Sequence, residues 1–165
     1  MNNNLPQLYT AHTDLVMARL RSPKVKDTDE PRAQELLAKC IEGVCVIRGA
    51  QVDKAGIGLM AALLAGQMRQ DAPVADMTWE EVAKALQDGA FGKYGEVYGI
   101  NAASLYDMLW GYLQGEERAE LNRKVRELLT GAERKRQEQV QRFLEEHPAY
   151  AAIIKKNAEF FNQQK

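Results

Sequence analysis

Glycines, a lysine and aromatic rings alternate in residues 89–99, named here the glycine segment. Glycines beside a lysine suggest a phosphate-binding loop, in which backbone N–H groups surround the phosphates. Such a loop needs a glycine five residues before its Gly-Lys pair and a Ser or Thr after that pair. Here Gln87 stands five residues before Gly92, and Tyr94 follows Lys93. The glycine segment is therefore interpreted as a shaped connection between helices rather than as a nucleotide-binding loop.

The same segment offers side chains that could bind a protein partner. These candidate contacts are Phe91, Lys93, Tyr94 and Tyr98. Glycines permit backbone conformations that other residues avoid, so they can present aromatic rings in a defined arrangement. Because aromatic side chains often contribute most of the binding energy at protein interfaces, we expect these residues to form a partner-binding site. The alternative is structural, with the aromatic rings packing over the connection.

Residue types that bind metals or catalyse reactions are few and poorly placed. The chain has two cysteines, Cys40 and Cys45, and two histidines. Side chains five residues apart on a helix point in different directions, so the cysteines form neither a zinc-binding pair nor an easy disulfide. The neighbouring carboxylates of Glu80 and Glu81 also diverge on a helix, and Glu81 has the position of a capping residue. We therefore expect no metal site, no cofactor and no enzymatic activity.

Basic residues gather in the C-terminal third of the chain. They are Arg118, Arg123, Lys124, Arg126, Arg134, Lys135, Arg136 and Arg142. A helix that carries them could bind nucleic acid through its phosphates, although glutamates interleave with the basic residues. A helix-turn-helix role for residues 78–113 is less favourable, since Glu96 and Asp107 would approach phosphates there. Nucleic-acid binding through residues 118–142 is therefore the alternative to partner binding.

The composition limits the class of protein. The chain has 165 residues, with 22 Lys and Arg against 23 Asp and Glu. This length is typical of one domain with its own core, and the balanced charge argues against a general nucleic-acid coat protein. No apolar run approaches the roughly 20 residues of a membrane span, and the N-terminus does not have the pattern of a signal peptide. We expect a cytoplasmic protein without a membrane span.

Apolar residues at helical spacing predict the first elements. Residues 6–21 form a helix with His12 at the edge of the core, and residues 22–30 form a polar loop. Pro31 then opens a second helix. Residues 44–47 could instead be a short strand, but a lone strand would have no partner, so they are predicted to be helical.

A third helix, residues 53–70, is apolar over more than half of its circumference and is capped by Asp53. We expect this helix to lie at the centre of the fold. Gly56, Gly58 and Gly66 each cost about 1 kcal/mol relative to alanine, and they could allow another helix to approach closely.

Local signals define the helix before the glycine segment. Thr78 and Glu81 have the spacing of a capping box, and Met77 and Val82 that of a hydrophobic staple. Gly89 is in position to end this helix as a left-handed cap.

Helices are also predicted after the glycine segment. Asn101 caps the first of them, and a long charged helix follows over residues 116–146. Pro148 ends the long helix, and residues 147–165 form a short helix or tail. The prediction is an all-α protein: a single domain of six or seven helices, residues 1–146, with a central apolar helix and an extended C-terminal helical region.

The motif at the glycine segment resembles that of a known set of proteins. It consists of Gly92-Lys93-Tyr94-Gly95-Glu96-Val97-Tyr98, then Ile100-Asn101, and then Trp110 and Tyr112. It is similar to small helical proteins of prophages and mobile elements of gut bacteria, in which a Gly-Lys-Tyr-Gly-Lys-Val-Tyr-like run precedes a helix ending in Trp-Leu and Tyr.

The resemblance covers residues 78–126 and implies an accessory protein of a mobile element that binds a protein partner. DNA replication is our hypothesis for the process, because the set has no established activity. The chain departs from the pattern at Glu96, where a basic residue is common, and at Leu109-Trp110-Gly111, which shifts the Trp-Leu pair.

Overall fold

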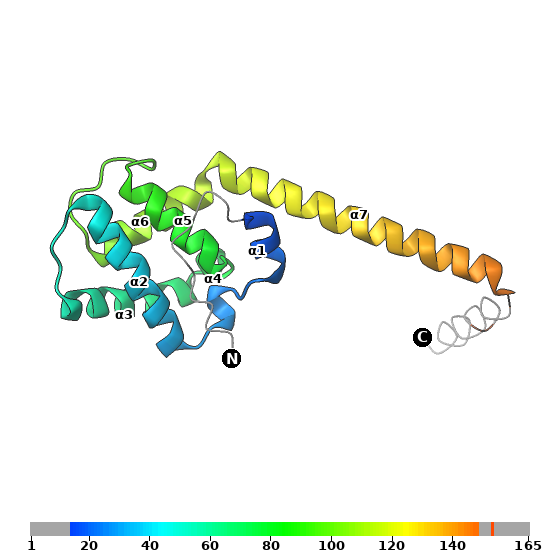
Figure 1. Ribbon diagram of the computed structural model, residues 1–165, viewed down its shortest axis with the longest axis horizontal. Helices are drawn as coiled ribbons and strands as arrows, with labels where there is room; N and C mark the ends of the chain where they lie inside the picture. Colours follow the sequence, from blue (N-terminus) through cyan, green and yellow to red (C-terminus); the bar gives the residue numbers. More distant parts are fainter. Residues whose placement is uncertain (1–13, 149–152, 154–165) are drawn as a thin grey trace. The chain divides into compact units, whose positions relative to one another are not determined.

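The computed structural model describes residues 14–148 and 153 (Figure 1). Over these residues the chain forms seven α-helices and one short 3-10 helix, without any strand. The all-α class is thereby confirmed. The chain divides into two compact units, Met1–Val125 and Arg126–Lys165, and each is described by itself. Among the described helices, none combines the length and the apolar character that a membrane span requires.

Helix α1 (Leu15–Arg21) begins after Asp14, whose side chain accepts hydrogen bonds from the backbone N–H groups of Val16 and Met17. The backbone of Asp14 is extended, so the continuous helix predicted from residue 6 is wrong at this residue. A carboxylate that binds these N–H groups favours a helix start here. The earlier part of the predicted helix, with His12, lies outside the described residues.

The predicted polar loop contains a buried turn. The 3-10 helix η1 (Val25–Asp27) lies in this loop, and the side chain of Val25 is fully buried. An isolated antiparallel bridge joins Lys24 to Thr78. The pattern did not reveal this turn because Val25 is a lone apolar residue without helical neighbours in the sequence.

Helices α2 (Glu30–Arg48) and α3 (Lys54–Gln70) pack against each other. Gly49 ends α2 with a φ of 63°, a conformation that glycine adopts without strain. Residues 44–47 are helical, as predicted. Asp53 caps α3 by accepting a hydrogen bond from the backbone N–H of Gly56 at 2.8 Å, which also confirms the predicted start.

Helix α5 (Trp79–Ala90) follows the short α4 (Ala72–Ala75). Most residues of α5 are buried, and it contacts α1, α2 and α6. Helix α3 contacts α2, α4, α6 and η1, in agreement with its predicted central place, although Leu59 and Leu63 are exposed on one of its faces. Apolar side chains cover more than half of the circumference of α3, and its neighbours leave the part with Leu59 and Leu63 uncovered.

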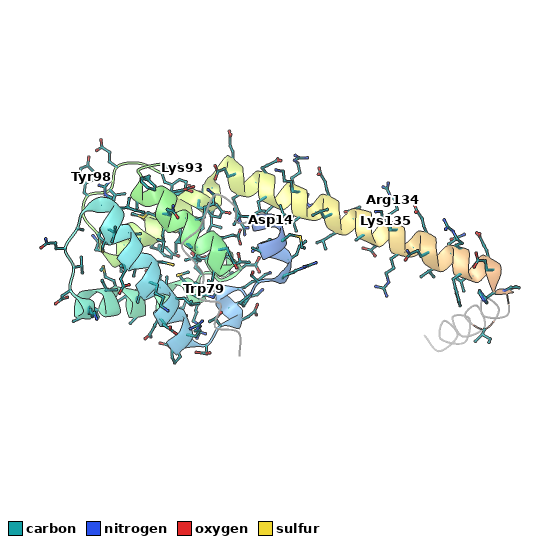
Figure 2. The ribbon with its side chains drawn as sticks, viewed as in Figure 1. Asp14, Trp79, Lys93, Tyr98, Arg134 and Lys135 are labelled. Carbon is teal, nitrogen blue, oxygen red and sulfur yellow. The ribbon has the colours of Figure 1, made fainter. Side chains whose placement is uncertain are left out.

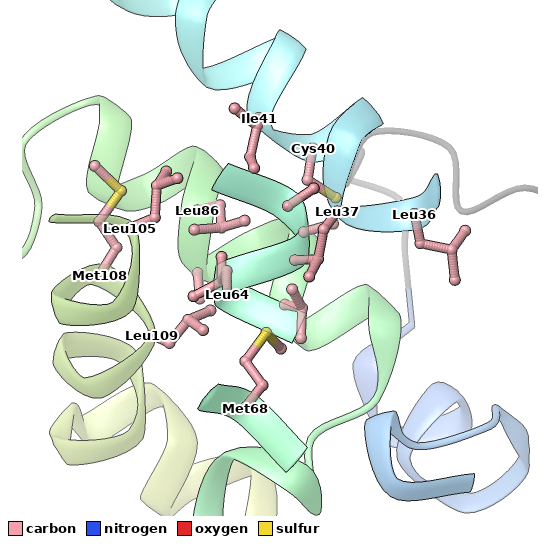
Figure 3. Packing of buried hydrophobic residues seen from close by; sticks show 14 of the residues in the cluster. Leu36, Leu37, Cys40, Ile41, Leu64, Met68, Leu86, Leu105, Met108 and Leu109 are labelled. Atoms are coloured by element: carbon pink, nitrogen blue, oxygen red, sulfur yellow. The ribbon is translucent and has the colours of Figure 1, made fainter. Parts of the chain in front are cut away.

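The core forms where α2, α3, α5 and α6 (Ala102–Gln114) meet, and Figure 3 shows their side chains around Leu64 and Leu86. The capping box of Thr78 and Glu81 is present at the start of α5. Asn101 caps α6 by accepting from the backbone N–H of Ser104 at 3.0 Å. Both helix starts therefore agree with the sequence prediction.

Gly89 does not end α5, so the predicted glycine cap is wrong. The helix continues to Ala90, and Gly89 lies inside it. A Cβ atom on Gly89 would stand 2.4 Å from Cγ of Met108 in α6. The glycine therefore allows α5 and α6 to approach closely.

Helix α7 (Glu116–Glu146) ends where the long charged helix was predicted to end. Within the first unit, Arg118 and Leu121 of α7 are buried. In the second unit, every described residue of α7 from 126 to 143 is exposed. The predicted short helix or tail over residues 147–165 falls almost wholly outside the described residues and stays a prediction.

Candidate partner-binding site

The glycine segment follows α5 and leads into α6. Gly92, Gly95 and Gly99 have φ values of 85°, 118° and 83°. Residues with a Cβ atom rarely adopt such values, so these glycines are what permits the path of the backbone. The aromatic residues between them are therefore presented by a chain of defined shape.

Tyr94 anchors the segment on α6. Its ring lies over Gly111, where an added Cβ atom would stand 2.5 Å from Cβ of Tyr94. The Tyr94 hydroxyl donates to Asp88 at 3.4 Å. Burial raises the pKa of Tyr94 above its ordinary value, and the nearby carboxylates of Asp88 and Glu117 add to this effect. The contacts of Tyr94 with Gly111 and Asp88 thus hold the segment in place.

Lys93 joins a cluster of alternating charges that ties the segment to α5 and α7. Its ammonium lies 3.1 Å from Asp88 and 2.5 Å from Glu117, and Lys84 lies 2.7 Å and 3.2 Å from the same two carboxylates. Burial opposes the charged form of Lys84, but these contacts raise its pKa above the ordinary value. Burial likewise opposes the charged form of Asp88, whose pKa the two lysines nevertheless lower.

Arg48, at the end of α2, holds the far side of the segment. Its guanidinium donates to the carbonyl oxygen of Val97 at 2.9 Å and to that of Ala90 at 3.4 Å. Sequence reasoning did not single out Arg48, because nothing local to α2 indicates which loop its side chain reaches. The segment is therefore fixed by contacts from α2, α5, α6 and α7.

Two aromatic residues of the segment remain exposed. Phe91 is 70% exposed and Tyr98 is 83% exposed. Figure 2 shows Tyr98 pointing outward from the loop, with Lys93 also on it. The predicted contacts thus separate into two kinds: Phe91 and Tyr98 are available to a partner, whereas Lys93 and Tyr94 hold the segment. The alternative in which all three rings pack over the connection applies only to Tyr94.

A pocket of about 300 Å³ opens beside Tyr98, between the segment and the first turns of α6. Val97 and Met108 are among its lining residues, together with Tyr94 and Tyr98. Its charged lining residues are Glu96 and Asp107. From the sequence, both acids were expected to disfavour phosphate binding, and Glu96 also departs from the resembling motif, but neither was assigned to a site. The lack of basic residues between Lys93 and Arg118 is the signal that indicates an acidic site.

One residue of the alternative nucleic-acid site, Arg118, is buried in the core. Arg118 is 6% exposed and forms a buried ion pair with Glu81. The Glu81 carboxylate also lies 3.2 Å from Arg19 and accepts from the Tyr112 hydroxyl at 3.4 Å. The assignment of Arg118 to a nucleic-acid surface is therefore wrong, because a guanidinium bound to a buried carboxylate does not reach phosphates.

The other basic residues of α7 are exposed. Arg123 and Lys124 lie 2.7 Å and 3.6 Å from Glu120, within their own helix. Arg126, Arg134, Lys135 and Arg136 belong to the second unit, and Figure 2 marks Arg134 and Lys135 on α7. Within the described part of the chain, Arg134, Lys135 and Arg136 form no ion pair.

The described residues contain no group of three or more His, Cys, Asp and Glu side chains that could hold a metal ion. Cys40 and Cys45 are buried free thiols, and burial raises the pKa of Cys40 to about 12.

Comparisons with family models, with curated proteins and with solved structures give no match.

Proposed function

We propose that the protein is a non-enzymatic, cytoplasmic accessory protein that binds a protein partner through the glycine segment. The observation that carries this proposal is the exposure of Phe91 and Tyr98 on a loop that contacts of Lys93, Tyr94 and Arg48 hold in place. A large aromatic side chain on a preformed loop loses little conformational entropy when it is buried by a partner. That combination is typical of residues that dominate the energy of an interface.

The setting of the proposal comes from the sequence resemblance. The Gly92–Tyr98 run is similar to that of small helical proteins of prophages and mobile elements, so we propose the replication machinery of such an element as the place to seek the partner.

The test is affinity capture from the native host with quantitative mass spectrometry. The full chain is compared with a double variant, Phe91→Ala with Tyr98→Ala. A matched control, Val46→Ala, removes an exposed apolar side chain from α2, where Val46 is 81% exposed. We expect one protein to be enriched with the wild type and the control and lost with the double variant.

Equal capture by the double variant and the wild type would show that the glycine segment is not the binding surface. Circular dichroism of each variant accompanies the capture, because the proposal requires helical content to be unchanged. Loss of capture together with loss of helical content would not count in its favour, and a single Tyr98→Ala variant is then used instead.

Nucleic-acid binding is the second candidate function. It is favoured by the exposed run of Arg134, Lys135 and Arg136, whose charges have no counterion on the described chain. Glutamates at 133 and 138 flank this run and reduce its net field. We therefore rank it below partner binding.

A further inference from the structure

The pocket beside Tyr98 has a lining that selects one kind of chemical group. Its lining residues include the aromatic Tyr94 and Tyr98, the apolar Val97 and Met108, and the acidic Glu96 and Asp107. A group that fits such walls needs a positive charge together with an apolar stem. An anion or a neutral apolar group would meet only part of the lining.

No basic side chain of the described residues lines this pocket. The nearby Lys93 is held by Asp88 and Glu117, and Arg48 is held by the carbonyl oxygens of Ala90 and Val97. Asp107 forms no hydrogen bond or ion pair with the described residues, so its carboxylate is available to a ligand.

Glu96, another lining residue of the pocket, orients the Tyr98 side chain. Its hydroxyl donates a hydrogen bond to the carboxylate of Glu96, which raises the pKa of Tyr98. The face of a tyrosine ring attracts cations within about 6 Å of its centre. The contact with Glu96 therefore places an aromatic ring and a carboxylate side by side, as a bound cation would require.

The size of the pocket limits the ligand. About 300 Å³ is the lower end of the range of ligand pockets, which extends to about 1,000 Å³. A single amino-acid side chain fits this volume better than a nucleotide or a large cofactor.

We propose that this pocket binds an arginine or lysine side chain of the partner, whose docking segment is therefore basic. The inference rests on the proposed function, because it takes the glycine segment as the docking surface. The cationic head contacts Glu96 and Asp107, and the aliphatic stem lies against the rings of Tyr94 and Tyr98. Charge-assisted hydrogen bonds to the carboxylates then distinguish basic side chains from neutral ones.

The experiment uses small probes, so it does not need the partner. The ¹⁵N-labelled full chain is titrated with N-acetyl-arginine methylamide, N-acetyl-lysine methylamide and, as a neutral isostere, N-acetyl-citrulline methylamide. We expect saturable amide shifts at residues 95–107 with at least one of the two basic probes, in the millimolar range, and none with citrulline. If only one basic probe binds, it identifies the side chain that the pocket prefers.

Variants assign the effect to the pocket. Glu96→Gln and Asp107→Asn should each weaken binding by up to about fivefold, the scale expected for an exposed charge pair. Glu42→Gln, an exposed acid on α2 outside this pocket, should leave the affinity unchanged.

Equal shifts with citrulline, or no shifts with either basic probe, would overturn the inference. These results are independent of the capture experiment. Partner capture that depends on Phe91 and Tyr98, with no response to the probes, would retain the proposed function and refute the basic side chain. Probe binding that follows the expected pattern, without any captured partner, would retain the pocket and refute the proposed function.

Discussion

Glu81 is the residue at which helices distant in sequence meet. Its carboxylate is fully buried, and it completes the capping box of α5 by accepting from the backbone N–H of Thr78 at 2.8 Å. The same group bonds Arg19 of α1, Tyr112 of α6 and Arg118 of α7. A buried charge is tolerated only when it is paired and hydrogen-bonded, and these partners fulfil both conditions.

We predict that Glu81→Gln lowers the free energy of unfolding by about 3–5 kcal/mol, because it leaves the guanidinium of Arg118 buried without its counterion. Urea denaturation followed by circular dichroism measures the loss. Glu42→Gln, an exposed acid on α2, should change the free energy by less than about 0.5 kcal/mol. A loss below about 1 kcal/mol for Glu81→Gln would mean that the ion pair adds little to the fold.

At the scale of elements, α5 and α6 depend on the absence of a side chain at Gly89. A methyl group there would overlap Cγ and Cβ of Met108, at 2.4 Å and 2.7 Å, and Met108 is only 2% exposed. Gly58, on the exposed side of α3, has no atom within 4 Å of an added Cβ. A change from glycine to alanine therefore meets a crowded site at Gly89 and open space at Gly58.

We predict that Gly89→Ala destabilises the protein by about 1–3 kcal/mol through overpacking, despite the better helix propensity of alanine. Gly58→Ala should instead stabilise it by about 0.5–1 kcal/mol, since the propensity gain is unopposed. Thermal and urea unfolding of both variants measure the two signs. A stabilising Gly89→Ala would show that Met108 can move aside and that the close approach of the helices is not required.

These elements show which structural features can be inferred from the sequence. The starts of α3, α5 and α6 were predicted because a cap is made by residues within one turn of each other, such as Asn101 and Ser104. The role of Gly89 was not predicted, because whether it caps a helix or faces Met108 depends on a helix that lies later in the chain. The exposure of Leu59 was not predicted for the same reason, because it depends on which neighbouring helices cover α3.

The candidate site was predictable to a similar degree. The glycine segment was recognisable from its composition, and its positive φ values agree with that interpretation. The sequence did not show that Phe91 and Tyr98 are exposed while Lys93 and Tyr94 hold the segment. That difference depends on contacts with Gly111 and Glu117, which come later in the chain. Arg118 was wrongly predicted to lie on a nucleic-acid surface, because its partner Glu81 was expected only to cap its own helix.

At the scale of the whole molecule, the glycine segment and the basic run of Arg134, Lys135 and Arg136 belong to different units. The glycine segment, its pocket and the buried Glu81 network lie in Met1–Val125, whereas Arg134, Lys135 and Arg136 lie in Arg126–Lys165. A variant that removes charge from the second unit should therefore leave the first unit folded and its docking surface intact. This division allows the two functions to be separated by mutation.

We predict that Arg134→Gln, Lys135→Gln and Arg136→Gln together leave partner capture and the unfolding midpoint unchanged. The wild type should bind duplex DNA no more tightly than the non-specific range of about 10⁻⁴–10⁻⁶ M at physiological salt. Fluorescence anisotropy with labelled DNA at several salt concentrations measures this binding. Each phosphate contact that the triple variant removes should flatten the log–log salt dependence by about 0.9.

The variant Phe91→Ala with Tyr98→Ala provides the reciprocal control in the same assay, because it removes the proposed docking residues without changing the charge. If the protein acts through a partner, this variant loses capture while its weak DNA binding stays as it was. Nanomolar, salt-sensitive DNA binding that survives the aromatic changes and disappears in the triple variant would show that the second unit carries the function. The exposed aromatic rings of the glycine segment would then be surface residues without a partner.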